Sequence, residues 1–387
     1  IKQETKNNFA FVFVLLLLLS LPFKLAFTNI TLGFLIIAVI INYKKIKINF
    51  SASLLLPILL YILMLCSFFW TIDVSATQKA IPKEVFLLII PFIFAVIPQF
   101  NQLQINKINK YYAYGFVVFA VFFILRAVIR FIVIKDAAVF FYHQDQNKDL
   151  GLIPKDLNAI HFSVFSILAY VYFLACELKS SWQKISMSIL LVFILLLSSK
   201  NIILVLVLLI LIQVFFYSKI ANRLRLRNLT IILILLGFIV SFSKIKERFL
   251  VEFRTNSDKS ISHNVALNKN EGINNISIAD AWTKEQFHPS DYFPGTAFRV
   301  YQFRMFTEFL EEDAIFWKGF GLNASLNKLL EKEKQYNLYT GYGTFNFHNQ
   351  YVQNFAELGV VGFLLLLVIL YINTKKAFST KDFIHIA

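Results

Sequence analysis

Residues 348–370 read HNQYVQNFAELGVVGFLLLLVIL, so a polar segment that opens on His348 runs directly into an apolar one. At helical spacing its first half carries one polar stripe, made of Asn349 or Gln350, Gln353, Asn354 and Glu357. Lipid cannot solvate such a stripe, so it must face protein or water. Gly359 and Gly362 leave the next turn without bulk. These features predict a membrane helix with a titratable ring at its entrance.

Composition extends this prediction to the whole chain. Hydrophobic residues make up 58% of it and charged residues only 16%, with a mean hydropathy of +0.64. An ordinary soluble domain has about a quarter charged residues, so this chain is a polytopic membrane protein. Ten apolar runs stand out: Phe9–Leu21, Ile30–Ile41, Ala52–Trp70, Val85–Ile97, Tyr111–Ile134, Ala159–Leu178, Ile185–Ser198, Ile202–Tyr217, Leu229–Phe242 and Val352–Ile372. We expect an all-α bundle with about ten crossings and soft boundaries, because several runs are shorter than the roughly 20 residues of a full span.

The distribution of charge predicts the orientation of the bundle. With the N-terminus in the cytosol, the clusters at 44–47, 107–110, 219–227 and 375–381 all lie inside, and they are strongly basic. The long loop Ser243–Phe347 has equal numbers of acidic and basic residues. The net charge of +15 therefore reflects the orientation of the helices in the membrane, and we reject nucleic-acid binding. We expect three parts: an N-terminal bundle of nine helices at 1–242, an external loop domain at 243–347, and a segment at 348–387 with the tenth helix. The chain opens on Ile1 and ends at Ala387 shortly after an apolar helix, and we expect the natural protein to continue.

The external loop has its own periodicity and is expected to fold and carry function. Within it, Thr255–Ser290 is polar and is expected to be irregular. Apolar residues at helical spacing predict an amphipathic helix over Phe298–Glu312. A Gly-Phe-Gly turn at 319–321 and a short helix beginning near Asn323 or Ser325 follow.

Three motifs carry a resemblance to a known family. His348, Asn349, Gly359 and Gly362 fit a pattern of histidine, then Asn, Ser or Gln, nine variable residues, a glycine, and a second small residue three further on. Arg299 and Phe303 are followed by Gly319 and Gly321, where the family carries an arginine, an aromatic that is usually Trp, and a glycine-x-glycine. Ser199 and Lys200 stand where the family has Ser-Arg. The chain thus resembles the O-antigen ligase and O-antigen polymerase superfamily.

The resemblance implies an enzyme of the bacterial inner membrane that moves a glycan from undecaprenyl diphosphate to an acceptor such as lipid A-core at the periplasmic face. Such a reaction needs cations for the diphosphate and a base for the acceptor hydroxyl, but no metal or cofactor. His348 and Arg299 are the implied catalytic residues. The candidates for binding diphosphate are Lys200, Arg299, Arg304, Arg126 and Arg130. The motif residues Asn349, Glu357, Gly359, Gly362, Gly319 and Gly321 are expected to shape the site.

Each assignment has a structural alternative. His348 could cap a helix, Arg299 and Lys200 could be solvated charges, Glu357 could hydrogen-bond to another helix, and Arg126 and Arg130 could snorkel toward the surface. A repeat-unit polymerase shares the fold and much of the motif with a ligase. A transporter would also place charges in a bundle, but no inverted repeat is visible and the long loop would be left without a role.

Overall fold

The structure, a computed structural model, describes residues 1–46, 48–141, 151–154, 157–176, 179–197, 199–217, 230, 233, 237, 274–288, 290–380 and 383–386. These residues are almost entirely helical, and the strands among them are one parallel pair of two residues each, Asn274–Asn275 (β1) and Asp291–Tyr292 (β2). The all-α prediction is therefore confirmed. The chain divides into two compact units, Ile1–Ile48 with Val96–Lys246 and Ala377–Ala387, and Asn49–Ala95 with Glu247–Lys376.

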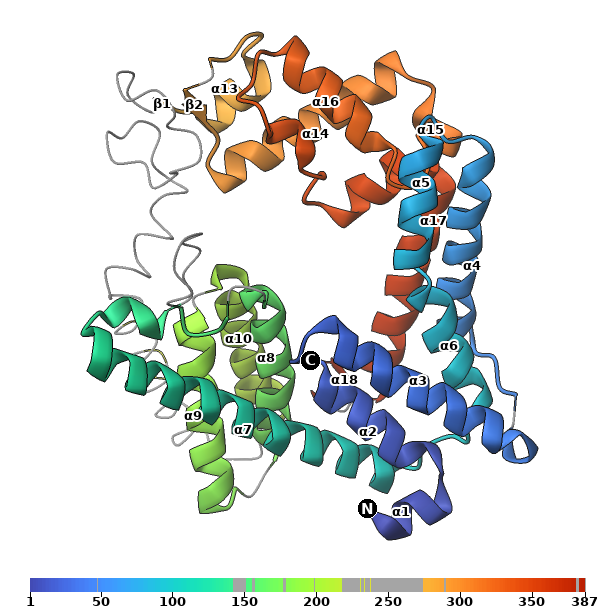
Figure 1. The fold of residues 1–387 in the computed structure, drawn as a ribbon, viewed down its shortest axis with the longest axis vertical. Helices are drawn as coiled ribbons and strands as arrows, with labels where there is room; N and C mark the ends of the chain where they lie inside the picture. The colour runs from blue at the N-terminus through green and yellow to red at the C-terminus, as the bar shows by residue number, and fades with distance from the viewer. Residues whose placement is uncertain are drawn as a thin grey trace. The chain divides into compact units, whose positions relative to one another are not determined.

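The first unit is a helical bundle around one large apolar core. Its elements are α1 (Lys2–Asn7), α2 (Ala10–Ser20), α3 (Leu25–Ile41), η1 (Tyr43–Lys45), α7 (Gln102–Ile134), η4 (Ala137–Phe140), α8 (Ala159–Ala175), α9 (Ser181–Leu197), α10 (Lys200–Ile212), η5 (Gln213–Tyr217) and α18 (Phe383–Ile386) (Figure 1). Phe116, Phe162 and Phe193, from α7, α8 and α9, are buried together in its core. Helix α7 begins nine residues before the predicted run because Asn101 and Gln104 form a capping box there.

The second unit combines apolar helices with the folded part of the long loop that the sequence predicts to be external. Its elements are α4 (Ala52–Cys66), η2 (Ser67–Phe69), α5 (Val74–Ala80), η3 (Ile81–Lys83), α6 (Phe86–Val96), α13 (Ile278–Thr283), α14 (Gly295–Glu312), α15 (Ile315–Lys318), α16 (Ser325–Gln335), η7 (Tyr342–Thr344) and α17 (Gln350–Thr380), with β1 and β2. In Figure 1, α4, α5 and α6 run alongside α17, and Leu60, Leu358 and Leu365 belong to the apolar cluster between them.

Among the described residues, three helical segments are long and apolar enough to cross a membrane by length and composition: Ala52–Phe69, Gln102–Ile134 and Gln350–Thr380. Shorter apolar helices cover Ala10–Ser20, Leu25–Ile41, Ala159–Ala175, Ser181–Leu197 and Asn201–Tyr217. Large apolar side chains such as Val118, Ile129 and Val133 of α7 are exposed on the outside of the helices, as expected of surfaces that contact lipid. Ten crossings stays a prediction, and the run Leu229–Phe242 falls largely outside the described residues.

The external loop differs from the sequence prediction at one point. Of the segment expected to be irregular, residues 274–283 form β1 and α13, while residues 255–273 lie outside the described part. Helix α13 forms because Ser277 caps it, its Oγ accepting from Asp280 N at 3.0 Å. Ile276 and Ala281 bury their side chains in the loop core. A few apolar residues in a polar segment were enough to anchor it.

Candidate active site at the start of the last long helix

Helix α14 carries Arg299 and the aromatic residue against which His348 packs. The amphipathic prediction is confirmed, because Phe298, Tyr301, Met305 and Phe309 at helical spacing are all buried in the loop core. The helix begins at Gly295, directly after Pro294. This arrangement leaves the opposite face of α14, including Arg299, in solvent.

His348 stands two residues before the first residue of α17 in a left-handed backbone conformation, with φ of +50°, which non-glycine residues seldom adopt. The cap of the helix is Asn349 instead, whose Oδ1 accepts from Tyr351 N at 3.0 Å and from Val352 N at 3.4 Å. The reading of His348 as a helix cap is therefore wrong. Its ring is free to serve another purpose.

The imidazole of His348 is held at one nitrogen and exposed at its other end. Its Nδ1 lies 2.8 Å from the backbone oxygen of Asn346. A carbonyl oxygen only accepts, so Nδ1 carries the proton and Nε2 of the neutral ring carries the lone pair. The ring packs against Phe298 at 5.8 Å and Phe345 at 5.7 Å between centroids. This arrangement is that of an oriented base.

Arg299 follows the phenylalanine on which the His348 ring rests. The contact with Phe298 therefore places the histidine beside the first turns of α14, where the arginine lies. Arg299 is exposed, and within the part of the chain that the structure describes no group pairs with its guanidinium. The exposed cation and the exposed ring therefore belong to α14 and to the residues that pack against it.

The two glycine motifs contact each other through their backbones. Gly319, at φ +67°, lies so close to the backbone of Glu357 that a Cβ there would stand 2.3 Å from its carbonyl carbon. Gly359, at φ +66°, makes the reciprocal approach to Trp317, where a Cβ would stand 2.3 Å from the carbonyl oxygen. We call this the glycine contact. Because only glycine tolerates both the positive φ and the missing space, it accounts for the two motifs together.

The glycine contact also explains a break in α17. The helix is kinked at Gly359, and carbonyls just before the kink accept from the Gly-Phe-Gly turn. Phe320 N donates to Ala356 O at 2.8 Å, and Gly321 N donates to Glu357 O at 2.9 Å. The turn thereby supplies hydrogen bonds at the kink, as backbone groups at membrane depth require.

The polar stripe of α17 turns inward, as predicted. Asn354 and Glu357 are buried. The carboxylate of Glu357 accepts from Gln353 Nε2 and, at 3.3 Å, from Ser325 Oγ. Gln353 Oε1 in turn accepts from Phe347 N at 3.1 Å. Glu357 therefore hydrogen-bonds to another helix, and its partner Gln353 accepts from the backbone of Phe347, the residue before His348.

Residues 185–367 match the sequence model of the family described as O-antigen ligase. This region belongs to the O-antigen ligase family. The resemblance drawn from the motifs is thereby confirmed, and the matched region contains His348, Arg299, both glycine pairs and Lys200. Membership in the O-antigen ligase family implies a glycan ligase or polymerase with a glycan donor and a glycan acceptor. No curated protein matches the chain.

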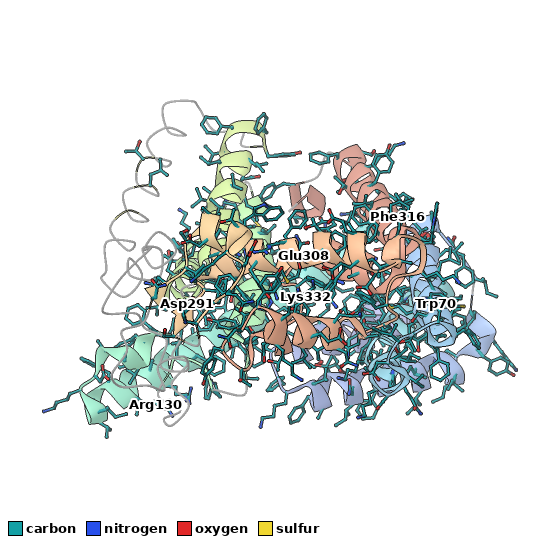
Figure 2. The ribbon with its side chains drawn as sticks, turned by 90° about the horizontal axis from the view of Figure 1, so that it is seen from above. Trp70, Arg130, Asp291, Glu308, Phe316 and Lys332 are labelled. Atoms are coloured by element: carbon teal, nitrogen blue, oxygen red, sulfur yellow. The ribbon has the colours of Figure 1, made fainter. Side chains whose placement is uncertain are left out.

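Arg304, another cation of this O-antigen ligase region, is fully engaged by protein groups. Its three guanidinium nitrogens donate to Glu308 Oε1 at 3.0 Å, Lys284 O at 2.8 Å and Tyr336 Oη at 2.9 Å. Glu308 also accepts from Lys332 at 2.7 Å, and Figure 2 shows these two side chains together between α14 and α16. These contacts favour a role for Arg304 in joining the helices of the loop.

The remaining candidate cations belong to the first unit. Lys200 is the first residue of α10, with Ser199 as the preceding cap residue. Arg126 donates to Leu152 O at 3.2 Å and Arg130 to Gly151 O at 3.4 Å. Both arginines thus hold the segment that precedes α8. No group of three or more His, Cys, Asp or Glu with the spacing of metal ligands occurs among residues of the described ranges.

The segment between α4 and α5 fastens the Gly-Phe-Gly turn from its other side. Trp70 Nε1 donates to Lys318 O at 2.7 Å, Ile72 N donates to Phe320 O at 3.0 Å, and Thr77 Oγ1 donates to Leu322 O at 2.8 Å. Figure 2 shows Trp70 near Phe316, at the same end of the unit. Sequence reasoning missed this contact. A cluster of Ser, Thr and Trp at a predicted external helix end was the available signal.

Sequence reasoning also missed Asn346, whose backbone oxygen contacts the His348 ring, and Gln302. Gln302 Nε2 donates to the same Asn346 oxygen that accepts from His348. Gln302 lies among Phe and Met residues on the apolar face of α14. A glutamine at such a position was a visible signal that its amide makes a buried hydrogen bond.

Proposed function

We propose that this protein transfers a glycan from undecaprenyl diphosphate to lipid A-core or a similar acceptor, at the periplasmic face of the bacterial inner membrane. The observation that carries this proposal is the packing of an exposed, oriented histidine, close before α17, against α14, the helix that also carries the unpaired cation Arg299. His348 is exposed with its Nδ1 held by Asn346 O, and Arg299 is exposed and follows Phe298, on which that histidine packs, in the chain.

In the proposed reaction, the acceptor hydroxyl oxygen attacks the anomeric carbon of the glycan as the bond from that carbon to the diphosphate oxygen breaks. His348 Nε2 takes the hydroxyl proton. The leaving undecaprenyl diphosphate gains negative charge on its oxygen, and Arg299 stabilises that charge. Each group acts on charge that develops in the transition state, so each contributes to the rate and not only to binding.

Lys200 is proposed as a second cation for the diphosphate. A lysine in the first turn of a helix opposes the helix dipole, so the stability of α10 does not explain its position. The N-terminus of a helix and a lysine both attract phosphate. Arg126 and Arg130 are proposed as weaker candidates, because both already donate to backbone carbonyls.

The contacts within each unit support the proposed orientation. Glu4 pairs with Lys107 at 2.5 Å, and both were placed in the cytosol. Trp70 and Thr77 donate to Lys318 O and Leu322 O, which flank the Gly-Phe-Gly turn, and the sequence predicts that both segments lie outside. Reporter fusions test the orientation: a fusion within Thr255–Ser290 should report the periplasm and one near Arg225 the cytosol. The opposite result from either fusion would refute the proposed orientation.

Deletion of the gene tests the function. Cells that lack a ligase should lose all long surface glycans on a gel and accumulate carrier-linked polymer, whereas cells that lack a polymerase should keep single-repeat caps. His348→Ala and Arg299→Ala should each abolish transfer while the protein remains in the membrane at the normal amount. The double variant should be little worse than either single variant, because both groups serve one transition state. An active His348→Ala protein would refute the mechanism.

A further inference from the structure

One backbone oxygen in the second unit accepts from two side chains of different elements. The oxygen of Asn346 receives Nδ1–H of His348 at 2.8 Å and also Nε2 of Gln302 from the middle of α14. Gln302 is only 1% exposed. The base at the start of α17 is therefore tied, through a single carbonyl, to a buried side chain of another helix.

The other end of the Gln302 amide is unsatisfied. No donor reaches its Oε1 among the residues that the structure describes. The reversed amide would face one oxygen toward another, so the hydrogen bond to Asn346 fixes its orientation. A buried amide oxygen without a donor lowers stability, and a methionine would fill the same space without that cost. Burial alone thus does not explain a glutamine here, whereas its donor to Asn346 does.

The segment that Gln302 holds would otherwise be free to turn. Asn346 and His348 are both exposed, and His348 has a left-handed backbone conformation. Asn346 Oδ1 accepts from His348 N at 3.1 Å, which fixes the backbone of the histidine but not its ring. The direction of the Asn346 carbonyl decides which ring nitrogen carries the proton.

We propose that Gln302 is a positioning residue for His348. By holding the Asn346 carbonyl toward Nδ1, it keeps the ring in the tautomer whose Nε2 is able to accept the acceptor's proton. Without Gln302 the Asn346 carbonyl turns away, and the His348 tautomer with a proton on Nε2 becomes populated. In that tautomer Nε2 is not able to accept a proton. This inference rests on the proposed role of His348.

The test compares Gln302→Met with Met305→Leu, a change of a fully buried apolar side chain on the same helix. The full-length protein is assayed with polyprenyl-diphosphate-linked glycan extracted from cells that lack the gene, and with lipid A-core from the same cells. We expect kcat of Gln302→Met to fall by about tenfold or more, the scale on which partners that orient a ligating histidine act. KM for the donor and the amount of protein in the membrane should match the Met305→Leu control.

Several outcomes would overturn the inference separately from the function. If His348→Ala is inactive and Gln302→Met is as active as the control, Gln302 has no positioning role although the proposed function stands. A raised KM with unchanged kcat would assign Gln302 to substrate binding. If His348→Ala is active, the proposed function itself fails.

A measurement on the unaltered protein guards against a variant that fails to fold. With ¹⁵N-labelled histidine, the nitrogen shifts of neutral His348 should be those of the tautomer protonated at Nδ1. The signal is assigned by its loss in His348→Gln. A shift pattern of the Nε2-protonated tautomer would overturn the proposal without any change at Gln302.

Discussion

The ring of His348 packs across that of Phe298, with centroids 5.8 Å apart and planes 78° from each other. This edge-on contact joins residues that lie fifty positions apart, one in α14 and the other in the segment before α17. It brings the base of the proposed reaction to the helix that carries Arg299. Since the ring contact is apolar, it positions the imidazole without consuming either of its nitrogens.

The glycine contact should be sensitive to a single methyl group. Gly359→Ala should lower the free energy of unfolding by roughly 2 kcal/mol or more, since a positive φ alone costs an L-residue about 1–2 kcal/mol and a Cβ would collide with Trp317. Thermal unfolding of the purified protein measures this. Gly33→Ala is the matched control, because nothing lies within 4 Å of a Cβ there. Equal stability of the two variants would contradict the contact.

Asn349 should act through its cap and not through chemistry. Asn349→Ala should cost about 1 kcal/mol of stability, the usual effect of losing a capping side chain, since two backbone N–H groups lose Oδ1. Asn349→Ser and Asn349→Asp preserve an oxygen in place and should keep both stability and glycan transfer. A stable Asn349→Ser protein without transfer activity would instead make the amide part of the reaction.

Glu308 and Lys332 should give the external loop a pH-dependent stability. Burial raises the pKa of Glu308, but hydrogen bonds from Lys332 and Tyr336 outweigh it and hold that pKa below its ordinary value. Burial likewise lowers the pKa of Lys332, but the hydrogen bonds that it donates to Glu308 and Glu312 outweigh burial and raise that pKa. Glu308 therefore stabilises the fold above its unfolded pKa, and this contribution is lost as pH falls through its lowered folded-state pKa. Lys332 stabilises the fold below its unfolded pKa, and this contribution is lost as pH rises through its raised folded-state pKa.

The check on this network is thermal unfolding across pH. Glu308→Gln should flatten the loss of stability in acid. Lys332→Met should destabilise by about 3 kcal/mol near neutrality, as expected when a buried ion pair loses one partner. The double variant should cost less than the sum of the singles, because the two residues share one contact. Additive effects would show that the pair is not coupled.

Lys200 should matter through its charge. Lys200→Ala should abolish glycan transfer, while Lys200→Arg should keep it, because a guanidinium preserves the charge and adds a second donor for phosphate oxygens. The assay is transfer from the lipid-linked donor, with membrane amounts compared in parallel. Full activity of the alanine variant would reduce Lys200 to an ordinary residue at the start of α10.

Local pattern in the sequence was sufficient for the elements themselves. The spacing of Phe298, Tyr301, Met305 and Phe309 defined α14 and its buried face, because an amphipathic period reports directly which side of a helix leaves water. The inward stripe of α17 followed in the same way, since a carboxyl such as Glu357 is not left facing lipid. Motif residues likewise pointed to the start of α17 as the site.

Only the tertiary structure decided which groups meet. The sequence marked Gly319 and Gly359 as small, but the backbone that each approaches lies about forty residues away, and no local pattern encodes a partner at that separation. The same holds for Gln302 and Asn346, whose hydrogen bond orients His348. A periodicity specifies the face of a helix, whereas a hydrogen bond between elements depends on how two faces are packed together, and packing is set by the whole core at once.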